Sequence, residues 1–224
     1  METAETRLAE INGRIARAHE RFGAPPEAVT LVAVSKTFEA DAVEPFLKAG
    51  QRVFGENRVQ EAQGKWPALK AAYRDVQLHL IGPLQTNKAR EAVALFDVIE
   101  TLDRDKLARV LREEMDRAGR ELPCLVQVNI GGEPQKAGIA PEEALEFVRH
   151  CQGEYRLDIR GLMCIPPEGE PAGPFFAHLA TLGRQAQLPW LSMGMSADFE
   201  TAIAMGATHV RVGSALFGRR AASL

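Results

Sequence analysis

The chain has 224 residues, a length at which α/β barrels fold as one unit. It carries 27 Lys and Arg against 30 Asp and Glu, and a formal net charge of −3 gives no field that would attract nucleic acid or an anionic membrane. No run of eighteen apolar residues occurs, and the acidic N-terminus lacks a targeting segment. We therefore expect a single domain over residues 1–224 that binds neither nucleic acid nor membranes.

The three cysteines, Cys124, Cys151 and Cys164, show no CxxC spacing and lie in or beside apolar runs. This pattern predicts reduced, buried thiols rather than disulfides or zinc ligands. We therefore expect a cytoplasmic protein without a metal site.

The first predicted element is an amphipathic helix over residues 4–22. Its apolar residues recur at three- and four-residue spacing, and Gly23 and Pro25-Pro26 supply the stop signals. This helix precedes the first strand.

Strands and helices alternate from there to the end of the chain. The predicted strands cover residues 30–36, 52–56, 77–82, 98–102, 122–130, 157–164, 190–195 and 209–213. The predicted helices between them cover residues 40–49, 59–72, 87–95, 104–118, 141–151, 175–182 and 197–205. Eight such alternations predict a closed (β/α)8 TIM barrel. An open doubly wound sheet is the alternative, which the lack of a GxGxxG motif and of a second domain disfavours.

The first strand, residues 30–36, is apolar and ends in Lys36. At the carboxyl end of a buried strand, desolvation favours the neutral amine, which can form a Schiff base. A single lysine at a strand end is by default solvated or paired with a carboxylate, so the other strand ends must decide its role.

The last two strand ends carry candidate anion sites. Ser196 stands where a strand runs into a helix, so it is expected to cap that helix while free amides face outward. Gly213 permits a close backbone approach and leaves the amides of Gly213 and Ser214 exposed. Each feature alone is equally well explained as a plain cap or a plain turn. Opposite Lys36, they favour a ligand with both a phosphate and an aldehyde, which describes pyridoxal 5′-phosphate (PLP).

Three further residues have two interpretations each. Arg211 lies just before the phosphate loop and is placed to contact the pyridine nitrogen of PLP, or to form a salt bridge on the barrel rim. His79 either contacts the cofactor or is a hydrogen-bonded core residue. Lys136 is either a second aldehyde acceptor or a solvated loop lysine.

Several motifs in matching order closely resemble the family of PLP homeostasis proteins. They are Lys36 after Val-Ala-Val-Ser, Phe54-Gly-Glu-Asn57, His79 to Lys88, Gly161-Leu-Met163, Ser192 to Ser196 and Arg211-Val-Gly213. The resemblance covers nearly the whole chain and implies the barrel of the alanine racemase N-terminal domain. One departure is that the segment between Cys164 and Trp190 is short for the family.

The resemblance also implies roles for individual residues. PLP would be bound as a Schiff base on Lys36, with its phosphate held by Ser196, Gly213 and Ser214. Arg211 would contact the ring nitrogen. The remaining two residues, Asn57 and Met195, would line the pocket.

Three functions are compatible with these residues. The first is a PLP carrier or regulator that acts in vitamin B6 homeostasis without turnover and delivers PLP to apo-enzymes, with a monomer as the expected state. The second is an amino-acid racemase, which the end of the chain at Leu224 disfavours because the C-terminal β-domain of racemases would be absent. The third is an aldolase-like barrel that uses Lys36 without a cofactor.

Overall fold

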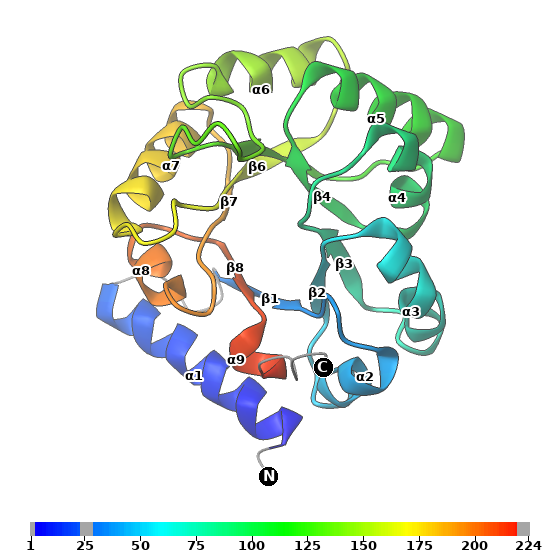
Figure 1. Cartoon of the computed structure of the whole chain (residues 1–224), viewed down its shortest axis with the longest axis vertical. Coiled ribbons are helices and arrows are strands. Elements are labelled where there is room, and N and C mark those ends of the chain that lie inside the picture. The colour runs from blue at the N-terminus through cyan, green and yellow to red at the C-terminus, as the bar shows by residue number, and fades with distance from the viewer. Residues whose placement is uncertain (1–2, 23–28, 219–224) are drawn as a thin grey trace.

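Eight parallel strands form a closed barrel in chain order, β1 to β8 (Figure 1). The computed structural model describes residues 3–22 and 29–218 of the chain. The strands are β1 (Thr30–Val34), β2 (Val53–Glu56), β3 (Gln77–Leu80), β4 (Val98–Leu102), β5 (Cys124–Val128), β6 (Ile159–Cys164), β7 (Trp190–Ser192) and β8 (His209–Val212). The barrel closes where β1 pairs with β8, with Val32 opposite Arg211. The predicted TIM barrel is confirmed, and the open sheet is wrong.

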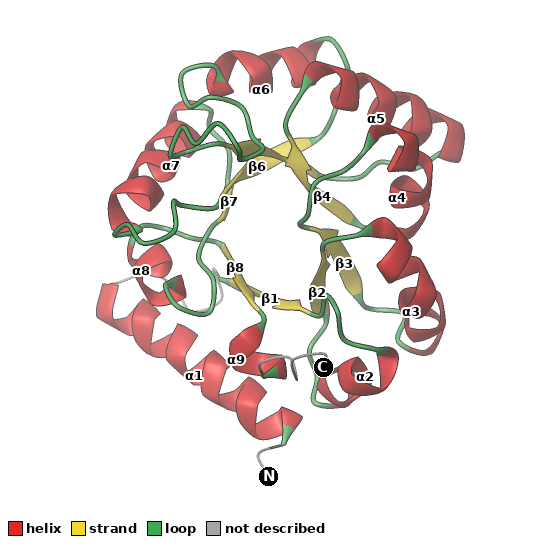
Figure 2. Ribbon diagram, viewed as in Figure 1, coloured by secondary structure: helices red, strands yellow, loops and turns green. Residues whose placement is uncertain are grey.

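A ring of helices surrounds the strands (Figure 2). The ring helices are α2 (Ala40–Lys48), α3 (Val59–Ala72), α4 (Ala89–Leu95), α5 (Asp105–Ala118), α6 (Ala144–Gly153), α7 (Gly173–Gln185) and α8 (Phe199–Ala204). A short 3₁₀ helix, η2 (Thr86–Lys88), precedes α4, and a single-turn helix, α9 (Ser214–Phe217), follows β8. Because helices cover the outside, most strand residues are buried, and the strands are largely apolar in the sequence.

The N-terminal helix α1 (Ala4–Phe22) lies outside this ring, across α8 and α9 (Figure 1). It buries Leu8, Ile11 and Ile15, which share one face of the helix. Arg14 fixes it to α8 through a bidentate ion pair with Glu200. The extra N-terminal helix is therefore confirmed, while the predicted stop signals Gly23 and Pro25-Pro26 lie outside the described residues.

Several strands end earlier than their apolar patterns predict. β1 stops at Val34 because the chain turns at Thr37, whose φ of 68° lies in the left-handed region. Likewise β7 stops at Ser192, and Gly194 with φ 92° begins the turn into the next helix. Lys36 and Met195 therefore stand on loops rather than on strands.

Within the described ranges, no helix has the length and apolar character needed to cross a bilayer. All three cysteines are free and buried, as the sequence predicts. Because eight terminal residues and residues 23–28 are not described, the single domain over residues 1–224 stays a prediction.

Candidate functional site

A pocket of about 410 Å³ lies where the strands end, at the mouth of the barrel. It is lined by Val34, Lys36, Asn57, Ile81, Ile165, Met195, Ser196, Ala197, Arg211, Gly213 and Ser214. All seven residues that the sequence predicts as the main ligand contacts are in this lining. They come from loops after β1, β2, β7 and β8 and from β8 itself, so they are brought together only by the closed barrel.

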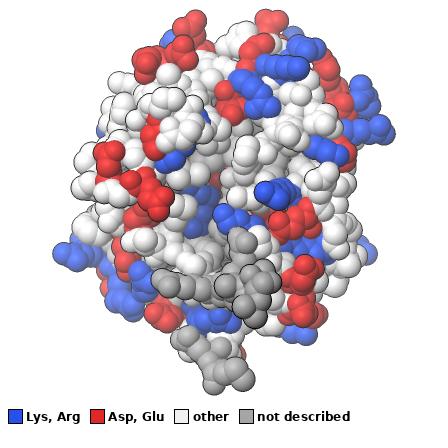
Figure 3. Space-filling view, in the orientation of Figure 1, with Lys and Arg blue, Asp and Glu red and all other residues white. Residues whose placement is uncertain are grey.

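The distribution of charged side chains favours entry of an anion at this mouth of the barrel. In the orientation of Figure 1, basic side chains occupy the hollow in the middle of the face, and both signs of charge are mixed around the perimeter (Figure 3). A local concentration of positive charge therefore exists in spite of the net charge of −3.

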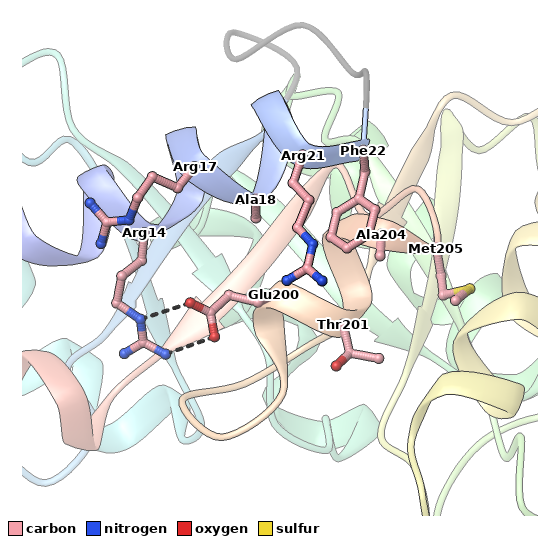
Figure 4. A pocket seen from close by; sticks show the side chains of 9 residues that line it. All are labelled: Arg14, Arg17, Ala18, Arg21, Phe22, Glu200, Thr201, Ala204 and Met205. Atoms are coloured by element: carbon pink, nitrogen blue, oxygen red, sulfur yellow. Dashed lines mark hydrogen bonds and ion pairs between the residues drawn. The ribbon is translucent and has the colours of Figure 1, made fainter.

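A larger groove of about 710 Å³ lies on the outside of the barrel, between α1 and α8 (Figure 4). Arg14, Arg17 and Arg21 line it, together with the exposed side chains of Phe22 and Met205. Its lining includes no lysine or cysteine, and it lies away from the strand ends, where barrels of this type carry their chemistry. We therefore place the functional site in the smaller pocket.

Lys36 lies on the exposed rim of that pocket, two residues beyond the end of β1. The expected desolvation of Lys36 at the strand end is not found, because the loop that turns at Thr37 carries its side chain out of the sheet to an exposed position. Its amine is instead accessible to an aldehyde that arrives from solvent.

A buried lysine holds the loop that carries Lys36. The Lys65 ammonium, supplied by α3, donates to the carbonyl oxygens of Ser35 (2.7 Å) and Phe38 (2.6 Å), one on either side of Lys36. It is also 2.9 Å from the Glu56 carboxylate. Both charged side chains are almost fully excluded from water, so a buried ion pair holds the loop from beneath.

Glu56 connects this loop to the barrel core. Its Oε1 atom accepts hydrogen bonds from the Ser35 hydroxyl (2.6 Å) and from the Trp66 indole (2.9 Å). A third restraint on the loop is the amide of Thr37, which donates to Glu61. The backbone on both sides of Lys36 is therefore held by side chains from β2 and α3.

Arg211 is buried inside the barrel and is held by two neighbouring strands. Its Nη1 donates to the Ser192 hydroxyl (2.7 Å), and its Nη2 donates to the carbonyl of Cys164 (2.8 Å). The Ser192 hydroxyl is 2.5 Å from Glu100 Oε2, and His79 Nδ1 is 2.7 Å from Glu100 Oε1. Arg211 makes no direct ion pair among the described residues, so the alternative of a salt bridge on the rim is wrong.

Glu100 is an ionised carboxylate at the centre of this network. Burial alone would raise the pKa of Glu100, but the hydrogen bond from His79 and the charges of His79, Arg211 and His209 outweigh burial and lower it to about 2. The interior of the barrel therefore contains a fixed negative charge close to Arg211.

The loops after β7 and β8 meet at the candidate phosphate position. The amide of Gly213 donates to the Ser196 hydroxyl at 3.3 Å, which joins the two loops. Ser196 does not cap α8, because that helix begins at Phe199 and follows Asp198, whose carboxylate accepts from the amide of Met195 (2.6 Å). The capping prediction is wrong, and this leaves the Ser196 hydroxyl at the pocket.

His79 and Lys136 do not line the pocket. His79 is a buried, hydrogen-bonded core residue, which was one of its two interpretations. Lys136 is half-buried on the loop after β5, where its ammonium donates to the carbonyl of Pro166 (2.9 Å) and pairs with Glu133. A role for Lys136 as a second aldehyde acceptor stays a prediction.

Comparison with known proteins identifies the family. Residues 7–221 match the family described as alanine racemase, N-terminal domain. The pyridoxal phosphate homeostasis protein of Aquifex aeolicus is 39% identical, over 96% of this chain and 97% of its own length. That of Escherichia coli K12 is 41% identical, over 95% of each chain. The chain belongs to the pyridoxal phosphate homeostasis protein family.

Solved structures place this family member among related barrels. PipY of Synechococcus elongatus, solved with PLP bound, has a TM-score of 0.81 and 40% identity, and the alignment covers 96% of this chain and all of PipY. A protein of unknown function from Bifidobacterium adolescentis has a TM-score of 0.89 and 31% identity, over 95% and 94% of the two chains. An alanine racemase of Clostridium difficile, 14% identical with a TM-score of 0.71, shares the fold, and this chain spans 58% of its length.

Some residues around the site of this homeostasis-family chain were not predicted. Glu100 accepts a hydrogen bond from Ser192, which contacts Arg211, and Lys65 holds the backbone of the loop that carries Lys36. Ile81 and Ile165 add apolar walls to the pocket. Glu100 could have been noticed in the sequence, since it is the one charged residue of the predicted strand over residues 98–102. The sequence gives no comparable signal for Lys65, because a lysine on a helix is usually solvated.

Proposed function

We propose that this chain binds PLP as a Schiff base on Lys36 and acts in PLP homeostasis as a carrier or regulator. The observation that carries the proposal is the lining of the 410 Å³ pocket, which contains all seven predicted contact residues. PipY, which is 40% identical, is described with PLP bound, and this supports the same ligand here.

The residues present fit the chemical groups of PLP. Lys36 offers an accessible amine, and PLP supplies an aldehyde that condenses with such an amine. Ser196 and Ser214 offer hydroxyls, which are groups that suit a phosphate, and the Gly213 amide donates to the Ser196 hydroxyl and so keeps it at the pocket. The pocket volume lies in the range of about 300–1,000 Å³ that is typical of small-molecule sites.

Arg211 supports a role without catalytic turnover. A guanidinium only donates hydrogen bonds, so it would pair with an unprotonated pyridine nitrogen, and an unprotonated ring withdraws electrons poorly. The curated relatives are named as homeostasis proteins. We therefore propose that racemase-type activity is weak or absent.

Three finer features belong to the same proposal. We propose that the recipients of PLP are PLP-requiring apo-enzymes, that the protein is a monomer and that it works in the cytoplasm. The three free, buried thiols support a reducing compartment.

Absorbance and mass spectrometry test the proposal directly. Purified protein incubated with PLP should turn yellow and, after borohydride reduction, carry one pyridoxyl-phosphate adduct on the peptide that contains Lys36. Lys36→Ala should abolish the adduct, and the matched rim variant Lys136→Ala should retain it. A colourless wild-type protein without adduct would contradict the proposal. A borohydride-trapped adduct formed with a phosphorylated carbonyl compound but not with PLP would instead favour the aldolase-like alternative.

A racemisation assay tests the proposal that racemase-type activity is weak or absent. Alanine and other amino acids should racemise no faster with the loaded protein than with free PLP. A rate that saturates with amino acid and disappears in Lys36→Ala would show that the chain is an enzyme.

A further inference from the structure

A buried carboxylate that the proposed function does not use stands behind Arg211. Glu100 is completely buried on β4, and among residues 3–22 and 29–218 it is the one carboxylate in the hydrogen-bond network around the Arg211 guanidinium. We propose that Glu100 is a positioning residue for Arg211: acting through the Ser192 hydroxyl, it fixes the guanidinium and balances its charge beneath the ligand pocket. This inference rests on the proposed binding of PLP.

The directions of the hydrogen bonds follow from the groups involved. Arg211 Nη1 can only donate, so the Ser192 oxygen accepts this bond. The Ser192 proton is then free to point at Glu100 Oε2, 2.5 Å away, where an ionised carboxylate can only accept. Ser192 thus links Glu100 to the guanidinium through two successive hydrogen bonds.

The other side of Glu100 is also fixed. His79 Nδ1 lies 2.7 Å from Glu100 Oε1, and because the carboxylate accepts, this ring nitrogen carries the proton. Both oxygens of Glu100 are therefore engaged, by residues from β3 and β7, and the carboxylate has a single orientation. The carbonyl of Cys164 on β6 holds the second nitrogen of Arg211 at 2.8 Å.

This arrangement determines what Arg211 presents to the pocket. A guanidinium has five N–H donors, of which two are used within the described residues, and Arg211 also lines the pocket, so it has donor capacity left for a ligand there. With Glu100 ionised, the buried positive charge is locally balanced, and Arg211 acts as a hydrogen-bond donor rather than as an excess positive charge. Without that carboxylate, the potential in the pocket would become more positive.

The pH at which the Schiff-base absorbance band of the PLP-loaded protein changes is a direct measure of this potential. Glu100→Gln removes the negative charge and keeps hydrogen-bonding capacity, so the protonated, cationic Schiff base is disfavoured. The pH midpoint of the change in the absorbance band should therefore move down by about one unit, the effect expected of one buried charge at a moderate distance. Glu100→Asp keeps the charge and should leave the midpoint near the wild-type value. Thr101→Val, which removes a buried hydrogen bond to Gly82 from the same strand, is the matched control and should not move it.

Ser192→Ala provides a second test that leaves the charge of Glu100 in place. Because Arg211 loses its hydrogen bond to the Ser192 hydroxyl, the dissociation constant for PLP should rise about tenfold, as for one charge-assisted hydrogen bond, while Thr101→Val leaves it unchanged. If Glu100→Gln and Ser192→Ala both behave like Thr101→Val in a wild-type background that binds PLP, the inference is overturned and the proposed function stands. If the wild-type protein binds no PLP, both the inference about Glu100 and the proposed function are contradicted.

Discussion

The Lys65 ammonium lies 2.9 Å from a Glu56 carboxylate oxygen, beneath the loop that carries Lys36. The side chains of this pair are 3% and 0% exposed. Removing one partner of a buried ion pair leaves the other charge without compensation, which is far more costly than loss of an exposed pair.

Lys65→Met should therefore lower the free energy of unfolding by about 3–5 kcal/mol, measured by urea denaturation. The matched control is Lys48→Met, because the Lys48–Glu44 pair spans 3.3 Å with side chains 64% and 42% exposed. The control should change stability by less than about 0.5 kcal/mol. Equal effects of the two substitutions would show that the buried pair does not stabilise the barrel.

Stability should decrease as the pH falls from about 6.5 toward 4, because of His209. Burial, together with the charges of His79 and Arg211, lowers the pKa of His209 from 6.5 to about 4 in spite of the attraction of Glu100. In this window the unfolded chain binds a proton that the folded chain does not, so the folded state loses stability as pH falls. By pH 4.5 the loss from this residue should reach about 2 kcal/mol.

His209→Gln should remove this part of the pH dependence. Unfolding free energies at pH 7.5 and 4.5 should differ less in His209→Gln than in wild type, while the exposed His178→Gln behaves as wild type. Glu100 titrates lower, since its pKa is about 2, so its stabilising contribution is lost only as the pH falls below about 4.5. A pH dependence identical in wild type and His209→Gln would contradict this assignment.

Gly82→Ala should destabilise the barrel and weaken ligand binding. A Cβ atom at Gly82 would lie 2.2 Å from the Asn57 carbonyl oxygen, so the backbone of this pocket residue must move. We expect a loss of about 1–3 kcal/mol in urea denaturation. Gly64→Ala, in the interior of α3 with no atom within 4 Å of its Cβ, should instead gain about 0.5–1 kcal/mol. A neutral Gly82→Ala would mean that Asn57 is not held by this contact.

The three thiols should be inert in the folded protein. Burial raises the pKa of Cys151 and of Cys164 to about 12 each, and that of Cys124 as well. Because the thiolate is the reactive form, Ellman's reagent at pH 8 should label no cysteine in the folded protein within minutes and all three in urea. Rapid labelling of one thiol in the folded state would show that one of these sites opens.

The barrel and the pocket residues could be predicted because their signals are local. Eight alternations of strand and helix suffice for closure, and polar residues after β1, β2, β7 and β8 then have to meet at one rim. Residues far apart in sequence, such as Lys36 and Gly213, thus fall into one pocket once the topology is known.

The local geometry around these residues could not be predicted. Thr37 is β-branched and adopts φ 68°, a conformation that no sequence rule assigns to threonine, and so the exposed position of Lys36 was missed. In Ser196-Ala-Asp198 either polar residue is a good cap, and the sequence does not indicate which of them precedes the helix. The burial of Lys65 depends on Glu56, which belongs to a different element.

The pairing of β1 with β8 has a consequence for biosynthesis. Val32 lies opposite Arg211, so two strands that are neighbours in the barrel are separated by almost 180 residues in the chain. During translation the N-terminal part of a chain emerges first, and a segment bearing Lys36 alone offers an amine without a phosphate site. We therefore expect the complete pocket to form only after β8 has been synthesised and has paired with β1.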